Sequence, residues 1–111
     1  MKMRVWWIPQ AGETNEPFYI PVHNVEEARK ILDILGAYDA YQLQNNIKPD
    51  YCNVGGLEVY NEETEDWEDW YIETENDYFD DVDEYIDSLD NAKEFQEFTE
   101  ELYKQIDLDV I

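Results

Sequence analysis

Residues 4–9, RVWWIP, are rich in β-forming side chains. These branched and aromatic side chains favour a β-strand, and FYIPV (Phe18–Val22) has the same character. The segment QAGETNE between them is polar and contains a glycine, so the two stretches predict a β-hairpin with a long loop. Pro21 is expected near a sheet edge or a strand end, because proline cannot donate a ladder hydrogen bond.

A helix and a second hairpin are predicted next along the chain. Apolar residues recur at helical spacing over 25–35, Asn24 is a potential cap, and Gly36 is the expected end of the helix. AYDAYQLQNN either continues this helix or forms a short one. LEVYN (57–61) and WEDWYIE (67–73) predict the second hairpin, with Gly55-Gly56 as a turn into its first strand.

Two apolar stripes predict helices in the C-terminal part. One stripe runs from Phe79 to Leu89 and predicts a helix over 78–89, capped by Asn76 or Asp77. The other predicts a helix over 91–105, capped by Asp90. The order ββα-ββ-αα therefore predicts an α+β fold, in which a small antiparallel sheet from two hairpins is packed by helices.

Charge divides the chain into two unequal halves. Its 111 residues carry a formal net charge of −22 and suggest a single domain over 1–111. Residues 1–50 hold seven acids and five bases, whereas residues 51–111 hold twenty-two acids and two bases. We therefore expect a near-neutral scaffold half, 1–56, and a strongly acidic half, 57–111. Such an acidic surface repels nucleic acid and anionic membranes and attracts basic protein surfaces.

The segment DYFDDVDEYIDSLD (77–90) is the most acidic part of the chain. On a helix, carboxylates at i and i+4 lie about 6 Å apart, close to the about 6.8 Å advance of two phosphate steps on one DNA strand. This spacing favours mimicry of nucleic acid, and a solvated acidic face is the alternative. The predicted partner-binding residues are Glu65, Asp66, Asp69, Asp80, Asp81, Asp83, Glu84 and Asp87, with Tyr78 and Tyr85 as aromatic anchors.

No catalytic, cofactor-binding or metal-binding residue is predicted. His23 precedes a helix, which suits a cap or surface role, and Cys52 has no histidine or basic residue near it in sequence, so we expect it partly buried. Zinc needs several Cys or His ligands, and the acidic segment lacks the glycine of an EF-hand calcium loop. The single cysteine and the lack of a long apolar run predict a cytosolic protein. The lack of a recognisable catalytic or metal-binding pattern predicts that it is not an enzyme.

Several motifs resemble a family of small acidic phage and prophage proteins. They are MKMRVWWIPQ, FYIPV, EARKILDIL, YQLQNNIKPDYCNVGGLEVY and WEDWY, and together they cover residues 1–73. The resemblance implies a phage or mobile-element setting, in the cytoplasm of a host bacterium. It carries over no functional residues.

The phage setting and the charge together predict an inhibitor of a host defence complex. The expected target is a CRISPR effector first and a restriction enzyme second, whose basic DNA or RNA channel the acidic half would occupy. One alternative is a protein-binding module with an exposed aromatic patch at Trp6, Trp7, Trp67 and Trp70. Another is a homo-oligomeric phage component.

Overall fold

A computed structural model describes residues 2–12, 16–47 and 52–107. A four-stranded antiparallel sheet has the order β2-β1-β3-β4, and β5 and β6 form a separate two-stranded sheet. The fold class is α+β, as predicted. The elements are β1 (Met3–Ile8), β2 (Phe18–Val22), α1 (Val25–Gln44), β3 (Val54–Asn61), β4 (Asp66–Asp69), β5 (Ile72–Glu73), β6 (Tyr78–Phe79), α2 (Val82–Asp87) and α3 (Ala92–Tyr103).

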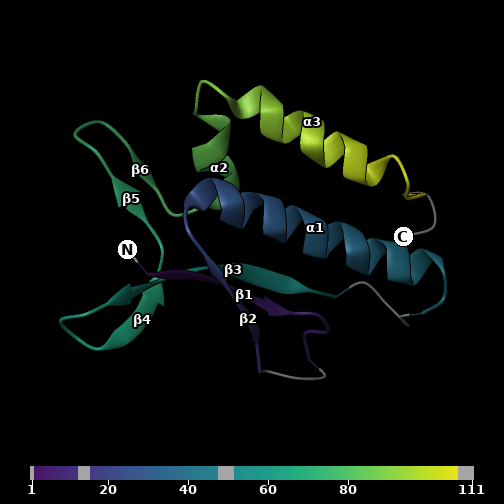
Figure 1. The fold of residues 1–111 in the computed structure, drawn as a ribbon, viewed down its shortest axis with the longest axis horizontal. Coiled ribbons are helices and arrows are strands. Elements are labelled where there is room, and N and C mark those ends of the chain that lie inside the picture. The colour runs from purple at the N-terminus through teal and green to yellow at the C-terminus, as the bar shows by residue number, and fades with distance from the viewer. Residues whose placement is uncertain (1, 13–15, 48–51, 108–111) are drawn as a thin grey trace.

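The three helices lie on one side of the four-stranded sheet (Figure 1). α1 packs directly on the sheet, and α3 runs along α1 on the side away from the sheet. The main core lies between α1 and the sheet and includes Val5, Ala28 and Leu57. A second core joins α1 to the end of α3 through Ala37, Ala40 and Ile106. No described helix covers the opposite face of the sheet.

Two adjacent tryptophans on β1 point to opposite faces of the sheet, and each lies over a glycine of β3. Trp7 pairs with Gly55 and is buried, whereas Trp6 pairs with Gly56 and is half-buried. A Cβ atom at Gly55 would overlap the Trp7 ring, and one at Gly56 would come within 2.7 Å of Trp6 Nε1. Gly55-Gly56 is therefore part of a strand that accommodates two indole rings, and the prediction of a turn there is wrong.

Helix α1 continues well past the predicted end at Gly36. Its start agrees with the sequence, since the Asn24 side chain accepts a 2.7 Å hydrogen bond from the Glu27 N–H. Gly36 is buried within the helix beside Ala37, and Ala40 follows one turn later. A glycine lowers the intrinsic stability of a helix, but the buried packing of these small residues offsets that loss. Tertiary contacts supply most of the stability of helices in proteins.

The C-terminal half departs from the prediction in its local structure. The stretch 67–73 is divided between β4 and β5, and Tyr78–Phe79 pairs with Ile72–Glu73 instead of starting a helix. α2 begins only at Val82, because Asp81 caps it by accepting the Glu84 N–H at 3.1 Å. The apolar stripe is nevertheless buried as expected, with Ile86 fully inaccessible to solvent.

The last helix matches its predicted range, but Asp90 does not cap it. The N-cap of α3 is Asn91, which makes no side-chain capping hydrogen bond. The two C-terminal helices are separate elements.

Replacing the two glycines by alanine should destabilise the protein unequally. Gly55→Ala must displace the buried Trp7 ring and also meets the Trp6 carbonyl oxygen at 2.9 Å. We expect it to lower the free energy of unfolding by about 1–3 kcal/mol, as overpacking does. Gly56→Ala should cost less, because Trp6 is half-exposed and can move outward. Urea denaturation of both variants measures the two losses of unfolding free energy. Equal losses, or a larger loss for Gly56→Ala, would contradict the placement of Trp7 in the core and of Trp6 on the outer side of the sheet.

Candidate functional site

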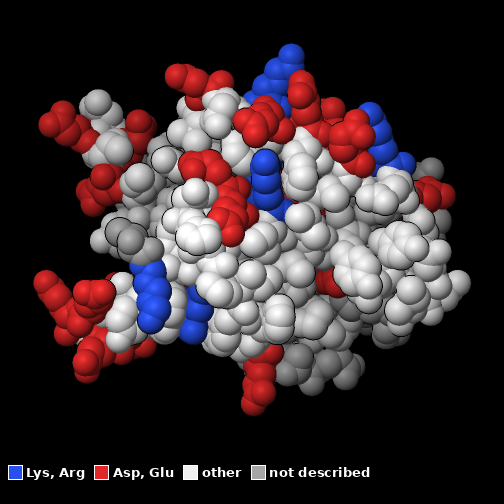
Figure 2. All heavy atoms as spheres, in the orientation of Figure 1, with Lys and Arg blue, Asp and Glu red and all other residues white. Residues whose placement is uncertain are grey.

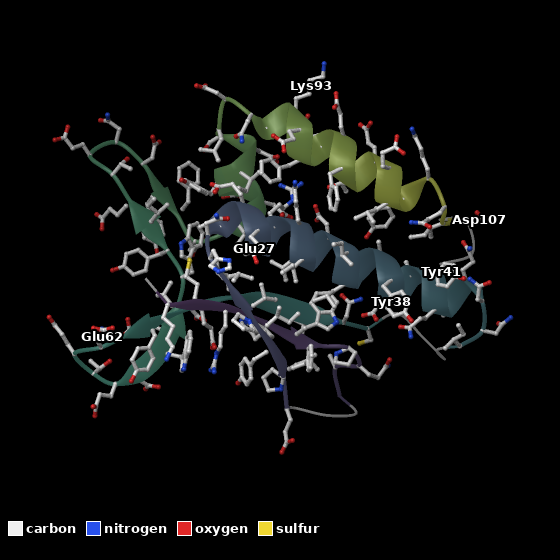
Figure 3. The ribbon with its side chains drawn as sticks, in the orientation of Figure 1. Glu27, Tyr38, Tyr41, Glu62, Lys93 and Asp107 are labelled. Atoms are coloured by element: carbon white, nitrogen blue, oxygen red, sulfur yellow. The ribbon has the colours of Figure 1, made fainter. Side chains whose placement is uncertain are left out.

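The β3–β4 hairpin projects from the body of the protein and ends in an acidic tip. The Asn61 carboxamide oxygen accepts hydrogen bonds from the backbone N–H groups of Glu63, at 2.9 Å, and Thr64, at 3.3 Å. Glu65 completes the turn with a positive φ of 54°. Figure 3 shows Glu62 at the outer end of this hairpin. The turn therefore holds its glutamates on a defined backbone.

The β5–β6 hairpin projects beside it and is fixed at both ends. At its tip, the Asp77 N–H donates to Thr74 Oγ1 at 3.0 Å. At its base, Ile72 and Phe79 pack against the main core. On its surface, the Tyr71 and Tyr78 rings stack with centroids 5.8 Å apart.

A cleft of about 830 Å³, the hairpin cleft, is lined by residues of both hairpins. Figure 2 shows acidic side chains gathered on the two hairpins that project at the left of the view. The cleft combines four carboxylates with three aromatic side chains, of which Tyr71 is 58% exposed, Tyr60 is half-buried and Trp70 is buried. These seven residues are Glu62, Glu63, Glu68, Glu73, Tyr60, Trp70 and Tyr71. A site of this composition suits the guanidinium or ammonium group of a basic side chain, through charge-assisted hydrogen bonds and cation–π contact.

Arg29 draws two of the predicted partner-binding acids toward the body of the protein. Its side chain is only 8% exposed, and Nε lies 3.0 Å from Asp33 Oδ2 and 3.2 Å from Asp83 Oδ1. Asp87 Oδ1 lies 3.7 Å from Nη1, and Thr99 donates to Asp33 Oδ2 at 2.7 Å. Arg29 therefore connects α1 to α2, and Asp33 connects α1 to α3.

Partial burial raises the pKa of Asp83, against the lowering effect of Arg29. The neighbouring carboxylates, Asp33, Asp81 and Asp87, raise this pKa further. A raised carboxyl pKa means that the charged form of Asp83 opposes folding at neutral pH. This cost is relieved as the pH falls through the pKa of the folded state.

The remaining predicted residues do not form one row. Tyr85 packs inward, with its ring 5.5 Å from Trp70 and 5.7 Å from Phe79. The others are exposed and spread over three segments: Glu65, Asp66 and Asp69 on the β3–β4 hairpin, Tyr78 on the β5–β6 hairpin, and Asp80, Asp81 and Glu84 around the start of α2. The expectation that the acids of 78–89 share one helical face is wrong, because α2 spans only Val82–Asp87.

The four tryptophans do not form one exposed patch either. Trp7 and Trp70 are 7% and 6% exposed and belong to the inner side of the sheet, whereas Trp6 and Trp67 are half-buried on the outer side. Strand alternation separates Trp6 from Trp7, and the same alternation separates Trp67 from Trp70.

The two residues considered for nucleophilic or metal chemistry are both exposed. His23 Nδ1 lies 3.0 Å from Glu27 Oε2 at the start of α1, which agrees with the predicted cap-region role, and this contact lowers the pKa of Glu27. Cys52 is exposed rather than partly buried, and its thiol donates to the Ala11 carbonyl at 3.6 Å.

Neither a metal site nor a membrane span is found in the described part of the chain. Among the residues that the structure describes, no three His, Cys, Asp or Glu side chains are arranged to hold a metal ion. Within the same residues, no helix has the length and apolar character needed to cross a membrane.

The fold and the hairpin cleft define a small acidic α+β protein with a recess suited to basic side chains. Residues 2–91 match the family described as superinfection exclusion gene product 17, and the chain belongs to that family. It is 44% identical over 100 residues to the superinfection exclusion protein of Salmonella phage P22, a match that covers 80% of this chain and 93% of the relative. No solved structure matches the chain.

The family corrects the functional prediction made from charge. The phage setting is confirmed, but the relatives point to superinfection exclusion and not to inhibition of a CRISPR effector or a restriction enzyme by nucleic-acid mimicry. The structure gives a physical reason for the error, since Asp83 and Asp87 face Arg29 instead of forming a phosphate-like row. The β5–β6 hairpin was not predicted from the sequence, and its Glu73 lies in the same recess as Glu62 and Glu63.

Removing the Arg29 charge should destabilise the whole C-terminal half. Arg29→Met keeps the length of the side chain but removes the cation that lies beside Asp33, Asp83 and Asp87. Breaking a buried ion pair in this way costs about 3–5 kcal/mol of unfolding free energy. Lys30→Met is the matched control, because the Lys30 pair with Glu94 at 3.7 Å is exposed and worth at most about 1 kcal/mol. Equal urea midpoints for the two variants would contradict the role given to Arg29.

Proposed function

We propose that this chain acts in superinfection exclusion as a non-enzymatic binding protein, in the cytoplasm of the infected cell. In this proposal the hairpin cleft holds an arginine- or lysine-bearing segment of a protein on which a second phage depends. The observation that carries the proposal is the position of four glutamates around three aromatic side chains in a recess of about 830 Å³.

The shape of the cleft supports a protein segment as the ligand. The recess is open and is bounded by two hairpins whose tips are fixed by the Asn61 and Thr74 hydrogen bonds. Because these turns are already ordered, binding costs little conformational entropy on this side of the interface. A volume of about 830 Å³ accommodates a few side chains of a partner protein.

The charge of the cleft supports a basic segment. Its charged lining residues are all glutamates, and the chain as a whole carries −22. The long-range field accelerates association with a basic partner, and the local carboxylates fix the position of its cations. Tyr71, held by its stack on Tyr78, offers a ring face to an arginine or lysine.

The groups in and around the cleft favour binding over catalysis. His23 and Cys52 are both exposed, and in the described structure they are not paired as base and nucleophile. Neither residue lines the cleft. The carboxylate with a raised pKa, Asp83, lies against Arg29 and outside the cleft. These placements favour recognition over acid–base catalysis.

The proposal is tested by neutralising the cleft while keeping the fold. We expect the variant Glu62→Gln, Glu63→Gln, Glu73→Gln to lose exclusion in a plating assay on cells that express the protein. Each lost carboxylate removes about 0.5–1 kcal/mol of attraction. The three together should weaken partner binding by about tenfold or more.

The control variant Glu84→Gln, Asp90→Asn, Glu100→Gln changes the net charge equally at exposed sites outside the cleft. It should exclude as the parent does, at equal protein levels measured by immunoblot. If both variants lose exclusion equally, total charge and not the cleft carries the function. If the parent excludes no phage in a panel infecting the same host, the proposed role itself is wrong.

A further inference from the structure

The outer side of the four-stranded sheet carries an aromatic surface that the helices leave uncovered (Figure 1). Strand alternation places one set of side chains on this side, opposite the core. Tyr19 is 42% exposed, and the other rings are half-buried. We call this surface the outer sheet face and define it by Lys2, Arg4, Trp6, Tyr19, Tyr60 and Trp67.

Cation–aromatic contacts hold the outer sheet face in one arrangement. The Arg4 guanidinium lies 3.6 Å from the centroid of the Tyr19 ring and 4.0 Å from that of Trp67. Lys2 Nζ lies 5.0 Å from the Tyr60 centroid and 5.9 Å from that of Trp67. Ordered tryptophan, tyrosine and arginine side chains are the residues that dominate binding energy at protein interfaces, and their order reduces the entropy lost on docking.

The charges of this face balance, unlike those of the chain as a whole. Arg4, Glu58 and Asp69 lie in one row across β1, β3 and β4, and Lys2 precedes β1 on the same side. Arg4 Nε pairs with Glu58 Oε1 at 2.8 Å. Two cations and two carboxylates therefore share the face, on a chain of net charge −22. A strongly acidic or a strongly basic partner would meet like charge here, whereas a surface with the same balance would not.

We propose that the outer sheet face is the contact surface for a second copy of this chain. A two-fold axis that lies between the two sheets and runs parallel to the strands sets β1 of one copy, with its cations, against β3 and β4 of the other, with their carboxylates. The aromatic rings of the two copies then pack as the inner layer of a sandwich. The helices and both acidic hairpin tips stay outside this contact.

The dimer is expected to be weak and to respond to salt. Four strands at about 4.8 Å spacing and about six residues at 3.3 Å rise give a face of about 20 Å by 20 Å. This is small for a specific interface, so assembly should depend on concentration in the micromolar range or above. Added salt screens the repulsion between two chains of −22, so it should strengthen the dimer. Binding of a basic segment in the hairpin cleft should instead weaken with salt.

Sedimentation velocity of the full chain over a concentration series tests the proposal. We expect the mass to rise from 13.4 kDa toward twice that value, more completely at high salt than at low salt. Tyr19→Glu should weaken the association by about tenfold or more, a loss of at least about 1.4 kcal/mol. Tyr38→Glu is the matched control, because it adds the same charge at an exposed tyrosine of α1.

A monomer at every concentration and salt level would overturn the proposal. A dimer that Tyr38→Glu disrupts as strongly as Tyr19→Glu would also overturn it, because the contact would then involve the α1 surface that Figure 3 shows around Tyr38 and Tyr41. Circular dichroism of both variants establishes that they fold. The cleft variant of Glu62, Glu63 and Glu73 should dimerise at least as well as the parent, because it carries less negative charge, and this separates the test from that of the proposed function.

Discussion

The structure depends on the contact between two adjacent tryptophans of β1 and two adjacent glycines of β3. Side chains at neighbouring strand positions must face opposite sides, so Trp6 and Trp7 require space on both faces of the sheet. Gly56 and Gly55 provide that space and fix the β1–β3 register. The register then places β4 at the edge of the sheet, with the β3–β4 hairpin projecting beside β5–β6 (Figure 1).

A chain of this charge also needs to limit repulsion among its own carboxylates. It does so in two ways, by pairing acids with the buried Arg29 and by placing others on hairpin tips that extend into solvent (Figure 2). The raised pKa of Asp83 shows that pairing with Arg29 does not fully offset the cost of its charge, because burial and neighbouring acids oppose the charged form. The second way concentrates carboxylates around the cleft.

The sequence was sufficient for the elements that depend on local chemistry. The first hairpin, the Asn24 cap of α1 and the apolar stripe ending in Ile106 follow from β-propensity, capping and periodicity, and all are present. The elements that depend on distant packing were not predictable in the same way. Gly36 continues a helix because small residues around it are buried, and the exposed Asp83 contacts Arg29, which is far away in sequence.

The hairpin cleft was missed for the same reason. Glu62 and Glu73 belong to different hairpins, and only the β1–β3 register and the packing of Ile72 on the core bring them to one recess. The tryptophan placements show the same limit. Alternation predicts that Trp6 and Trp7 face opposite sides, but only the position of the helices decides that Trp7 is the buried one.

We propose that one recess, and not the acidic surface at large, recognises basic side chains. The most direct measurement is a titration of the ¹⁵N-labelled protein with a short peptide of alternating arginine and serine, followed by amide and indole chemical shifts. The account predicts shift changes concentrated at residues 62–63, 68 and 70–73, including the Trp70 indole N–H. Shift changes spread evenly over the acids of α2 and α3 as well would contradict it.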